Sequence, residues 1–528
     1  MTTPSTPTHN PTFGQRLHNG SDAVGHQVPP PVLLFLFLII IVVIASAVLQ
    51  LFDASATFER INTDTHQVET QTQPVRSLLS GEGVRFMFSS LVPNFLGFVA
   101  LGQLVAAMLG VGVAEESGMI NAMIRKLVAV APRWILCYFI VFVGIQSSIA
   151  SNAGYLVLIP LAAVAFRSVG RHPLAGLAAG FAAVGGAFSI NIFITPTDAV
   201  LVELTNDAIH IIDPTASINL TSNVWFNIAS SLFLTVIITL VTERIIEPRL
   251  GKYTGTEQAD NPADANAKAK AKDGAANTPS PADEARGLRY ALFALLGVTA
   301  LICLLTLPPG APLRDPATGQ IIGNTPFMDG LIAMIMLVFL AMGTAFGFGA
   351  GTFKDIGDVI KAMHKTVVGL SGMIMMLFFI SQFVAYFNFS RIPTFLAISM
   401  SDTLEGMNVG PFFLLIGFII VIAIFNIFMT GAIGKWAMLA PVFVPLLMRL
   451  GVDPEVVLAA YRVGDSPTNT ATPMLSMFAL ILGFFQKYDK NAGIGTVFST
   501  MIPLVLCMLI SWILFFSAWY WLGIPFGF

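Results

Sequence analysis

Charged residues are scarce in this chain. Of its 528 residues only 11% are Asp, Glu, Lys or Arg, whereas 55% are hydrophobic. Soluble domains carry about 25% charged residues, so this composition excludes an ordinary soluble protein and predicts a chain that crosses a membrane many times. The formal net charge is only −3, which gives no indication of a nucleic-acid partner.

Cysteine is almost absent. The three cysteines, Cys137, Cys303 and Cys507, each lie inside an apolar run and share no regular spacing. This excludes a disulfide framework and a cysteine-based metal site. We expect all three to be ordinary interior residues.

Long apolar runs are what the sequence has in abundance. A helix needs about 20 residues to cross roughly 30 Å of hydrocarbon. By this measure we predict nine spans, of which the third and eighth are interrupted: Pro31–Leu51, Phe86–Val113, Pro173–Leu204, Val224–Val241, Tyr290–Leu307, Phe327–Phe348, Val367–Phe387, Pro454–Phe485 and Ile494–Trp521. Two shorter amphipathic segments, Met119–Val130 and Phe353–Lys365, are typical of helices that lie at the membrane surface.

Two further apolar segments are too short to cross and turn back at polar tips. Residues 134–167 read as two half-length helices around Ser147–Gly154, with Arg133, Arg167 and Arg171 at the ends. Basic residues at both ends place both ends on the cytoplasmic side. Residues 411–449 repeat this pattern around Gly431–Trp436. We therefore predict two re-entrant hairpins, which enter the membrane from opposite faces.

The predicted fold class is an all-α polytopic membrane protein with an inverted repeat. The first repeat is 31–244, the second is 326–522, and the connecting span is 290–307. Eighteen positions separate Tyr155 from Pro173 and also Trp436 from Pro454, which supports a duplication. Residues 1–30 read as a disordered cytoplasmic tail. The Ala/Lys/Asp/Pro-rich stretch within 245–289 reads as a flexible cytoplasmic linker.

The stretch Tyr461–Pro473 is the most informative part of the chain. Arg462 and Asp465 are three residues apart, which puts them within pairing reach on one helix face. Pro467 and Pro473 then interrupt the helix. Charged residues and unwound backbone at membrane depth indicate a functional site. Interrupted segments in matching places of two inverted halves are typical of the substrate site of a secondary transporter.

We expect four polar clusters to converge: Ser147–Gly154, Ile194–Asp198, Thr430–Trp436 and Arg462–Thr470. Free N–H groups at half-helix N-termini suit an anionic substrate group. Neutral oxygens at the breaks suit a sodium ion, for which the candidate ligands are Ser151, Asn152, Asn469 and Thr470. Asn is also a favoured cap residue, so a purely capping role for Asn152 and Asn469 is the alternative.

Several charged and aromatic residues have two interpretations. Arg462 matches a substrate carboxylate or sulfonyl group, or pairs structurally with Asp465. Asp198 has no basic residue nearby in sequence, so burial would raise its pKa and make it the candidate for proton coupling. Lys435 could extend to a membrane interface. Trp436, like Tyr155, offers a flat face to an aromatic ligand, although interfacial aromatics are common in membrane proteins.

The motif Gly434–Ala437, Pro454, Tyr461–Asn469 and Pro473 closely resembles the AbgT family, the aminobenzoyl-glutamate transporters. The resemblance covers Pro30–Leu522. It implies a dimeric inner-membrane carrier that handles p-aminobenzoyl-glutamate and exports sulfonamide antimetabolites at the expense of an ion gradient. It also assigns functional roles to Asp198, Trp436, Pro454, Arg462, Asp465 and Pro473. Ile433 replaces the small hydroxyl residue of the relatives, which puts a substrate hydrogen bond at that tip position in doubt.

Two other functions remain to be weighed. A sodium-coupled dicarboxylate importer would share the hairpins and the inverted repeat. An intramembrane aspartyl protease would use Asp198 and Asp465, but Arg462 would hold Asp465 ionised, whereas a protease dyad shares a proton. The expected location is the bacterial inner membrane, with the N-terminus cytoplasmic and the C-terminus periplasmic. No cofactor is expected beyond a possible sodium ion.

Overall fold

The computed structural model describes residues 31–61, 68–130, 132, 135–150, 154–251, 253, 279–321, 325–396, 398–399 and 410–528. The predicted tail at 1–30 and the centre of the predicted linker, 254–278, lie outside these residues. Within the described ranges, nine helices are long and apolar enough to cross a membrane. This confirms the all-α polytopic fold class.

The first half of the chain contains the predicted short hairpin helices and the first broken span. Its elements are α2 (Pro31–Leu51), β1 (Ser55–Ile61), β2 (Val68–Pro74), α3 (Gly81–Leu96), α4 (Val99–Glu116), α5 (Met119–Val130), α6 (Leu136–Gln146), η2 (Ser147–Ala150), η3 (Gly154–Leu158), α7 (Ile159–Ser168), α8 (Pro173–Val184), α9 (Pro196–Ile209), α10 (Val224–Val241), η4 (Thr242–Ile246) and α11 (Glu247–Leu250).

The second half contains the remaining long helices and the second broken span. Its elements are α13 (Pro281–Thr306), α14 (Pro326–Asp329), α15 (Leu331–Ala350), α16 (Ile356–Gly369), α17 (Ser371–Ser390), α19 (Pro411–Phe428), α20 (Ala432–Arg449), α21 (Pro454–Asp465), η5 (Pro467–Ala471), α22 (Phe478–Tyr488) and α23 (Ile494–Trp521).

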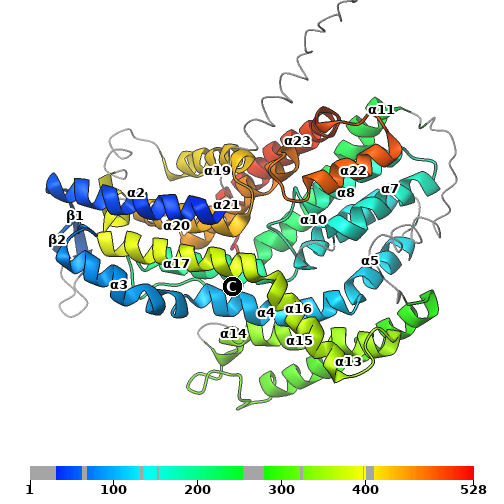
Figure 1. The fold of residues 1–528 in the computed structure, drawn as a ribbon, viewed down its shortest axis with the longest axis horizontal. Coiled ribbons are helices and arrows are strands. Elements are labelled where there is room, and N and C mark those ends of the chain that lie inside the picture. Colours follow the sequence, from blue (N-terminus) through cyan, green and yellow to red (C-terminus); the bar gives the residue numbers. More distant parts are fainter. Residues whose placement is uncertain are drawn as a thin grey trace, which may run out of the picture.

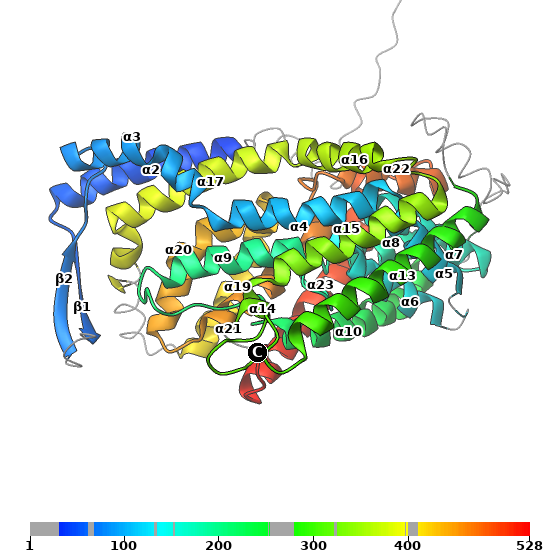
Figure 2. The same cartoon turned by 90° about the horizontal axis from the view of Figure 1, so that it is seen from below.

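The helices around the two breaks form the centre of the molecule. Helix α20 packs on α9, α19 packs on α21, and η5 packs on α23. In Figure 1 the strands β1 and β2 lie at one end of the long axis, together with α2 and α3, and the helices α5, α7 and α11 lie at the other. Figure 2 shows α4, α9 and α15 running side by side, with α4 in contact with both of the others. The outer helices α2 and α13 are mostly exposed, as expected of helices that face lipid.

The two strands were not predicted. Residues 53–82 read as a polar connection, but β1 and β2 pair as an antiparallel hairpin in which Ser55 faces Pro74. The strands contain the β-branched residues Thr57, Ile61, Val68 and Thr72, which favour extended backbone. The hydroxyls of Thr57 and Thr72 lie 3.0 Å apart across the pair.

Several predicted boundaries were wrong. The first broken span stops at Val184 rather than near Phe193, because two consecutive glycines, Gly185 and Gly186, follow α8. The end of the predicted linker is helical, because Ser280 caps the first turn of α13 and Pro281 occupies its first position. The predicted second span is divided into α3 and α4 at Gly97.

The helix count agrees with the predicted nine, but its members differ. The nine apolar helices include α19 and α20, which we predicted as arms of the second hairpin. They omit both broken spans, whose pieces are too short. The re-entrant character of the two hairpins and the inverted repeat stay predictions.

Candidate functional site

The first break is an extended segment between α8 and α9. Thr195 caps α9: its hydroxyl accepts the backbone N–H of Asp198, and Pro196 occupies the first helical position. In return the Asp198 carboxylate accepts the Thr195 backbone N–H at 2.7 Å and its hydroxyl at 2.8 Å. This reciprocal cap fixes Asp198 at the N-terminus of α9, where a carboxylate is electrostatically favoured.

The second break lies between α21 and α22. Helix α21 ends at Asp465, and Pro467 opens the single 3₁₀ turn η5. The amide nitrogen of Asn426 on α19 lies 2.6 Å from the Asp465 carbonyl oxygen and 3.0 Å from Oδ1 of Asn469. This side chain therefore satisfies the polar groups that the break leaves free.

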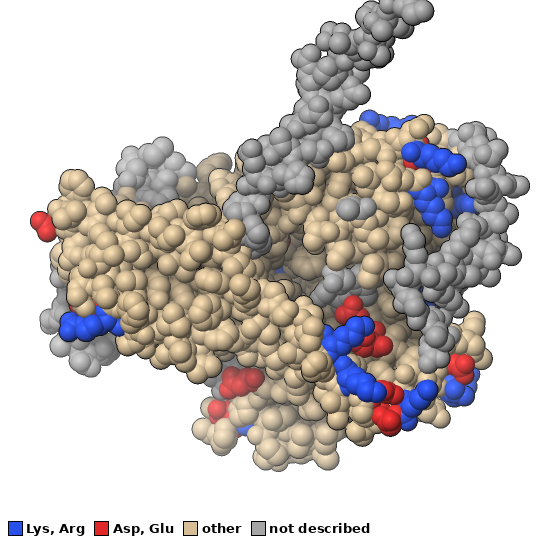
Figure 3. Space-filling model, in the orientation of Figure 1, with Lys and Arg blue, Asp and Glu red and all other residues tan. Residues whose placement is uncertain are grey.

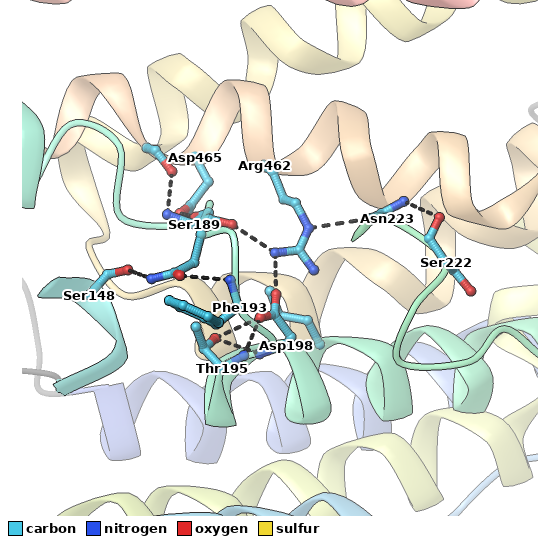
Figure 4. Close-up of polar contacts among 12 residues, drawn as sticks. Ser148, Ser189, Phe193, Thr195, Asp198, Ser222, Asn223, Arg462 and Asp465 are labelled. Atoms are coloured by element: carbon cyan, nitrogen blue, oxygen red, sulfur yellow. Dashed lines mark hydrogen bonds and ion pairs between the residues drawn. The ribbon is translucent and has the colours of Figure 1, made fainter. Parts of the chain in front are cut away.

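Arg462 reaches across from α21 to α9. Its Nη1 lies 2.6 Å from Oδ1 of Asp198 and 2.7 Å from the Ser189 carbonyl oxygen, and its Nε lies 3.3 Å from Oδ1 of Asn223. Figure 4 shows the guanidinium surrounded by these three groups. The side chains of Arg462 and Asp198 are 2% and 8% exposed, so this is a buried ion pair.

Asp465 has a different cation. Its Oδ1 lies 2.5 Å from Nζ of Lys435, which is completely buried in the first turn of α20. The hydroxyl oxygen of Tyr461 lies 3.1 Å from the same oxygen, and the hydroxyl of Ser189 donates to Oδ2 at 2.8 Å. Lys435 also bonds Asn426.

These contacts correct three predictions. Arg462 does not pair with Asp465, because each turns towards a partner on another helix. Asp198 does have a counter-ion, which is Arg462. Lys435 does not extend to an interface, since its side chain is buried against Asp465. In each case tertiary packing brings the charged residue into contact with a partner from another helix.

Ser189 links the two ion pairs. Its carbonyl oxygen accepts from Arg462 and its hydroxyl donates to Asp465. Its backbone N–H donates to the Ser466 hydroxyl at 3.1 Å, and Asn469 donates to the Gly185 carbonyl at 3.2 Å. The first break therefore lies directly against the second.

Both hairpin tips contact the breaks, as predicted. Asn191 in the first break donates to the Gln146 carbonyl oxygen at 3.0 Å and to the Ser148 hydroxyl at 3.1 Å. At the second tip, the Tyr461 hydroxyl donates to the Ala432 carbonyl at 2.5 Å. Gly431 at this tip has φ of +101°, a backbone conformation that glycine adopts without strain. The four predicted polar clusters therefore converge.

Trp436 has no face open to a ligand in this conformation. It is fully buried, and its indole N–H lies 2.9 Å from the Thr205 hydroxyl on α9. Its ring lies 4.5 Å from that of Tyr461. Pro454 opens α21, and Pro473 follows η5. Trp436 is packed inside the site, and the two prolines mark the start of α21 and the end of η5.

The described part of the predicted sodium site is engaged in protein contacts. Oδ1 of Asn469 accepts from Asn426, and the Thr470 hydroxyl donates to the Pro467 carbonyl at 3.2 Å. Ser151 and Asn152 lie outside the described residues. Within the described ranges no cluster of three His, Cys, Asp or Glu residues could hold a metal. The sodium site stays a prediction that depends on Ser151 and Asn152.

A cavity of about 770 Å³ lies beside this network. Its wall includes the second hairpin tip from Met429 to Gly434, together with Tyr155 and Asn469. Ile433 of the tip lines this cavity. Thr197 also lines the cavity, whereas its neighbour Asp198 and the other charged residues of the network lie behind the wall.

Sequence reasoning missed four residues that complete the site. Ser189 was read as part of a continuous span, although the preceding Gly185 and Gly186 could have indicated the break. Asn426 is the one amide in the otherwise apolar α19, which was a usable signal. Asn223 lies in a loop and Glu115 lines the cavity from the end of α4, and neither gave a usable signal.

The geometry does not fit an aspartyl protease. Asp198 and Asp465 each contact a separate cation, at 2.6 and 2.5 Å. A protease dyad requires two carboxylates that share one proton. The two acids here are parts of separate ion pairs.

Comparisons with known proteins agree with the motif. The model of the AbgT putative transporter family matches residues 16–528. The p-aminobenzoyl-glutamate transport protein of Escherichia coli K12 is 32% identical over 512 residues, which cover 97% of this chain and 96% of that protein.

Two solved structures are similar along almost their whole length. The YdaH transporter of Alcanivorax borkumensis has a TM-score of 0.85 and 38% identity, with 94% of this chain and 100% of that chain covered. MtrF of Neisseria gonorrhoeae, described among antimetabolite efflux pumps, has a TM-score of 0.85 and 37% identity, with 96% and 97% covered. The chain therefore belongs to the AbgT family, whose members are membrane transporters and not enzymes.

Proposed function

We propose that this chain carries p-aminobenzoyl-glutamate and related aryl acids across the bacterial inner membrane, driven by an ion gradient, and that it also exports sulfonamide antimetabolites. The observation that carries this proposal is the composition of the cavity. Met108, Met373, Met376, Met429 and Met477 supply a soft apolar wall, which adapts to aromatic ligands. Polar groups at the hairpin tip and on α4 suit the ends of such a ligand.

The buried ion pairs give this carrier a means of coupling cargo to movement. Arg462 and Asp465 on α21 bind two different elements, α9 through Asp198 and α20 through Lys435. A cargo carboxylate that competes for Arg462 would release Asp198. Binding and the relative position of α9 and α21 would then depend on each other.

Counterflow in proteoliposomes tests the substrate. We expect labelled p-aminobenzoyl-glutamate to exchange into vesicles preloaded with the unlabelled compound, and sulfonamides to compete. The alternative, a sodium-coupled dicarboxylate importer, predicts that small diacids compete better than either. Protein-free vesicles and the Arg462→Ala variant serve as controls.

The coupling ion is proposed to be the proton, with Asp198 as its carrier. Arg462 holds Asp198 in a charged contact, so proton loading requires that this pair opens during transport. We expect Asp198→Asn to lose transport under an imposed pH gradient. Full pH-driven activity in Asp198→Asn would reject the proposal. Loss of all wild-type activity on removing sodium would move coupling to the site around Asn152 and Asn469.

The carrier is further proposed to be a homodimer with a cytoplasmic N-terminus and a periplasmic C-terminus. Sedimentation or light scattering of the detergent-solubilised protein measures its assembly state. A monomeric mass would reject the dimer without affecting the proposed substrate.

A further inference from the structure

One acidic side chain of the cavity has no partner in the described part of the chain. Glu115 lies near the C-terminal end of α4 and lines the cavity together with Glu116 and Lys365. Nζ of Lys365 lies 2.7 Å from Oε2 of Glu116. Among the described residues, no hydrogen bond or ion pair holds the Glu115 carboxylate. It is therefore an acceptor that faces the cavity.

Glu115 lies some distance from the hairpin tip. Met108, Gly112 and Glu115 line the cavity from one face of α4, as residues four and three positions apart do. Met108 and Ile433 together line a second small cavity of about 40 Å³, so the tip is next to Met108. Seven residues of helix separate Met108 from Glu115, which corresponds to roughly 10 Å.

The two ends of the cavity therefore differ in chemistry. At the tip, helix α20 begins after Gly431 without a side-chain cap, and its first N–H groups suit a carboxylate. Near Glu115 the wall offers a hydrogen-bond acceptor. Met108 and Met429, which line the same cavity, lie at the tip end. An elongated ligand with a carboxylate at one end and an N–H donor at the other fits this order.

We propose that Glu115 accepts the hydrogen bond of the cargo's arylamine and thereby selects para-aminophenyl compounds. This inference rests on the proposed function. It specifies which chemical group p-aminobenzoyl-glutamate and amine-bearing sulfonamides share at the site. A neutral arylamine donates N–H to a carboxylate, and such a charge-assisted bond is stronger than one between neutral groups. A single acceptor then explains how two otherwise different ligand classes enter one carrier.

The test compares two ligands that differ only in the amine. Binding of p-aminobenzoyl-glutamate and of benzoyl-glutamate to the purified full-length protein is measured by calorimetry, which requires no ion gradient. We expect the wild type to bind the amino compound about tenfold more tightly. Glu115→Met removes the acceptor but matches the methionine wall, so the two affinities should become equal. Glu82→Gln, at an exposed acid on α3 that pairs with Arg76 and is not part of the cavity wall, should keep the wild-type ratio.

Thermal unfolding of each variant checks that the protein is folded. If Glu115→Met does not fold, Glu115→Gln keeps the shape and loses the charge, and its preference should fall several-fold. The inference is overturned if either folded variant keeps the wild-type ratio of the two affinities. It is also overturned if both affinities fall by the same factor. In that case wild-type binding of p-aminobenzoyl-glutamate would leave the proposed function standing. A wild type that binds neither ligand would reject the proposed function itself.

Discussion

Arg462 and Asp465 lie within pairing reach on α21. Nevertheless Arg462 pairs with Asp198 of α9, and Asp465 pairs with Lys435 of α20. A buried charge must recover the hydrogen bonds that it loses on leaving water. Asp465 gains contacts from Lys435, Tyr461 and Ser189, which a single bond to Arg462 would not replace. The pairing therefore follows the number of available donors and not the spacing along the helix.

Double-mutant cycles distinguish the two pairings. Removing one partner of a buried pair leaves an uncompensated charge and costs roughly 3–5 kcal/mol. We expect Arg462→Met and Asp198→Asn each to lower the free energy of unfolding by about that much, and the double variant to lose less than the sum. Thermal or denaturant unfolding in detergent gives the energies, and Arg462→Ala should also abolish transport.

The matched control combines Arg462→Met with Asp465→Asn. These residues are not paired, so their coupling should be weaker than that of Arg462 with Asp198. Stronger coupling between Arg462 and Asp465 would contradict the observed network. Because Asp465 pairs with Lys435, Lys435→Met combined with Asp465→Asn should show the second strong coupling.

Arg462→Lys tests whether the guanidinium also binds cargo. Lysine keeps the charge but replaces a planar fork with a point charge. If Arg462 contacts a cargo carboxylate during transport, we expect a weaker affinity in counterflow at nearly normal protein stability. Wild-type affinity in Arg462→Lys would restrict Arg462 to its structural pair.

At the scale of elements, the close contact between α19 and α21 holds the second break in place. A Cβ added at Gly464 would lie 2.6 Å from the Ile419 carbonyl oxygen, which is backbone and cannot rotate away. The helices can approach this closely only because residue 464 has no side chain. This contact positions Asn426 on α19 beside Asp465 at the break.

We expect Gly464→Ala to force α21 away from α19 and to destabilise the protein by about 1–3 kcal/mol. Transport should fall as well, because Asn426 would no longer reach the break. The control is Gly417→Ala on the same helix α19, where an added Cβ meets nothing within 4 Å. That variant should be neutral or slightly stabilising, since alanine favours helix. Equal unfolding temperatures for the two variants would contradict the packing argument.

On the scale of the whole molecule, charged side chains gather at one end. Ion pairs join Arg125 to Glu284, Arg171 to Glu247 and Lys365 to Glu116. Figure 3 shows most of the visible Lys, Arg, Asp and Glu residues in its right-hand part, and only a few at the left and lower centre. Basic residues near helix ends are typical of the cytoplasmic side. The strands β1 and β2 lie at the other end of the long axis.

Single cysteines and a membrane-impermeant maleimide test this orientation. We expect Lys361→Cys, on the exposed side of α16, to react in inside-out vesicles and not in intact cells. Thr57→Cys, on β1, should show the reverse. The wild type is the background control, because Cys137 is buried and Cys303 and Cys507 lie within apolar helices. Labelling of both positions from the same side would contradict the orientation.

The sequence by itself determined the membrane class, most of the helices and the presence of the two breaks. Apolar runs, Pro and Gly act locally through burial and backbone geometry, so the bounds of α5 and α23 were predicted as they are observed. The motif around Arg462 also identified the family, because several residue types recur there at fixed spacing. The convergence of the four polar clusters followed from their places at paired breaks.

Only the tertiary structure decided which charges pair and which residues face the cavity. Asp198 is 264 positions from Arg462, and no local pattern connects them. Trp436 is buried against α9, whereas Ile433, three residues away, lines the cavity. Such differences arise because a helix turns successive side chains in different directions, and what each one meets depends on the neighbouring helix.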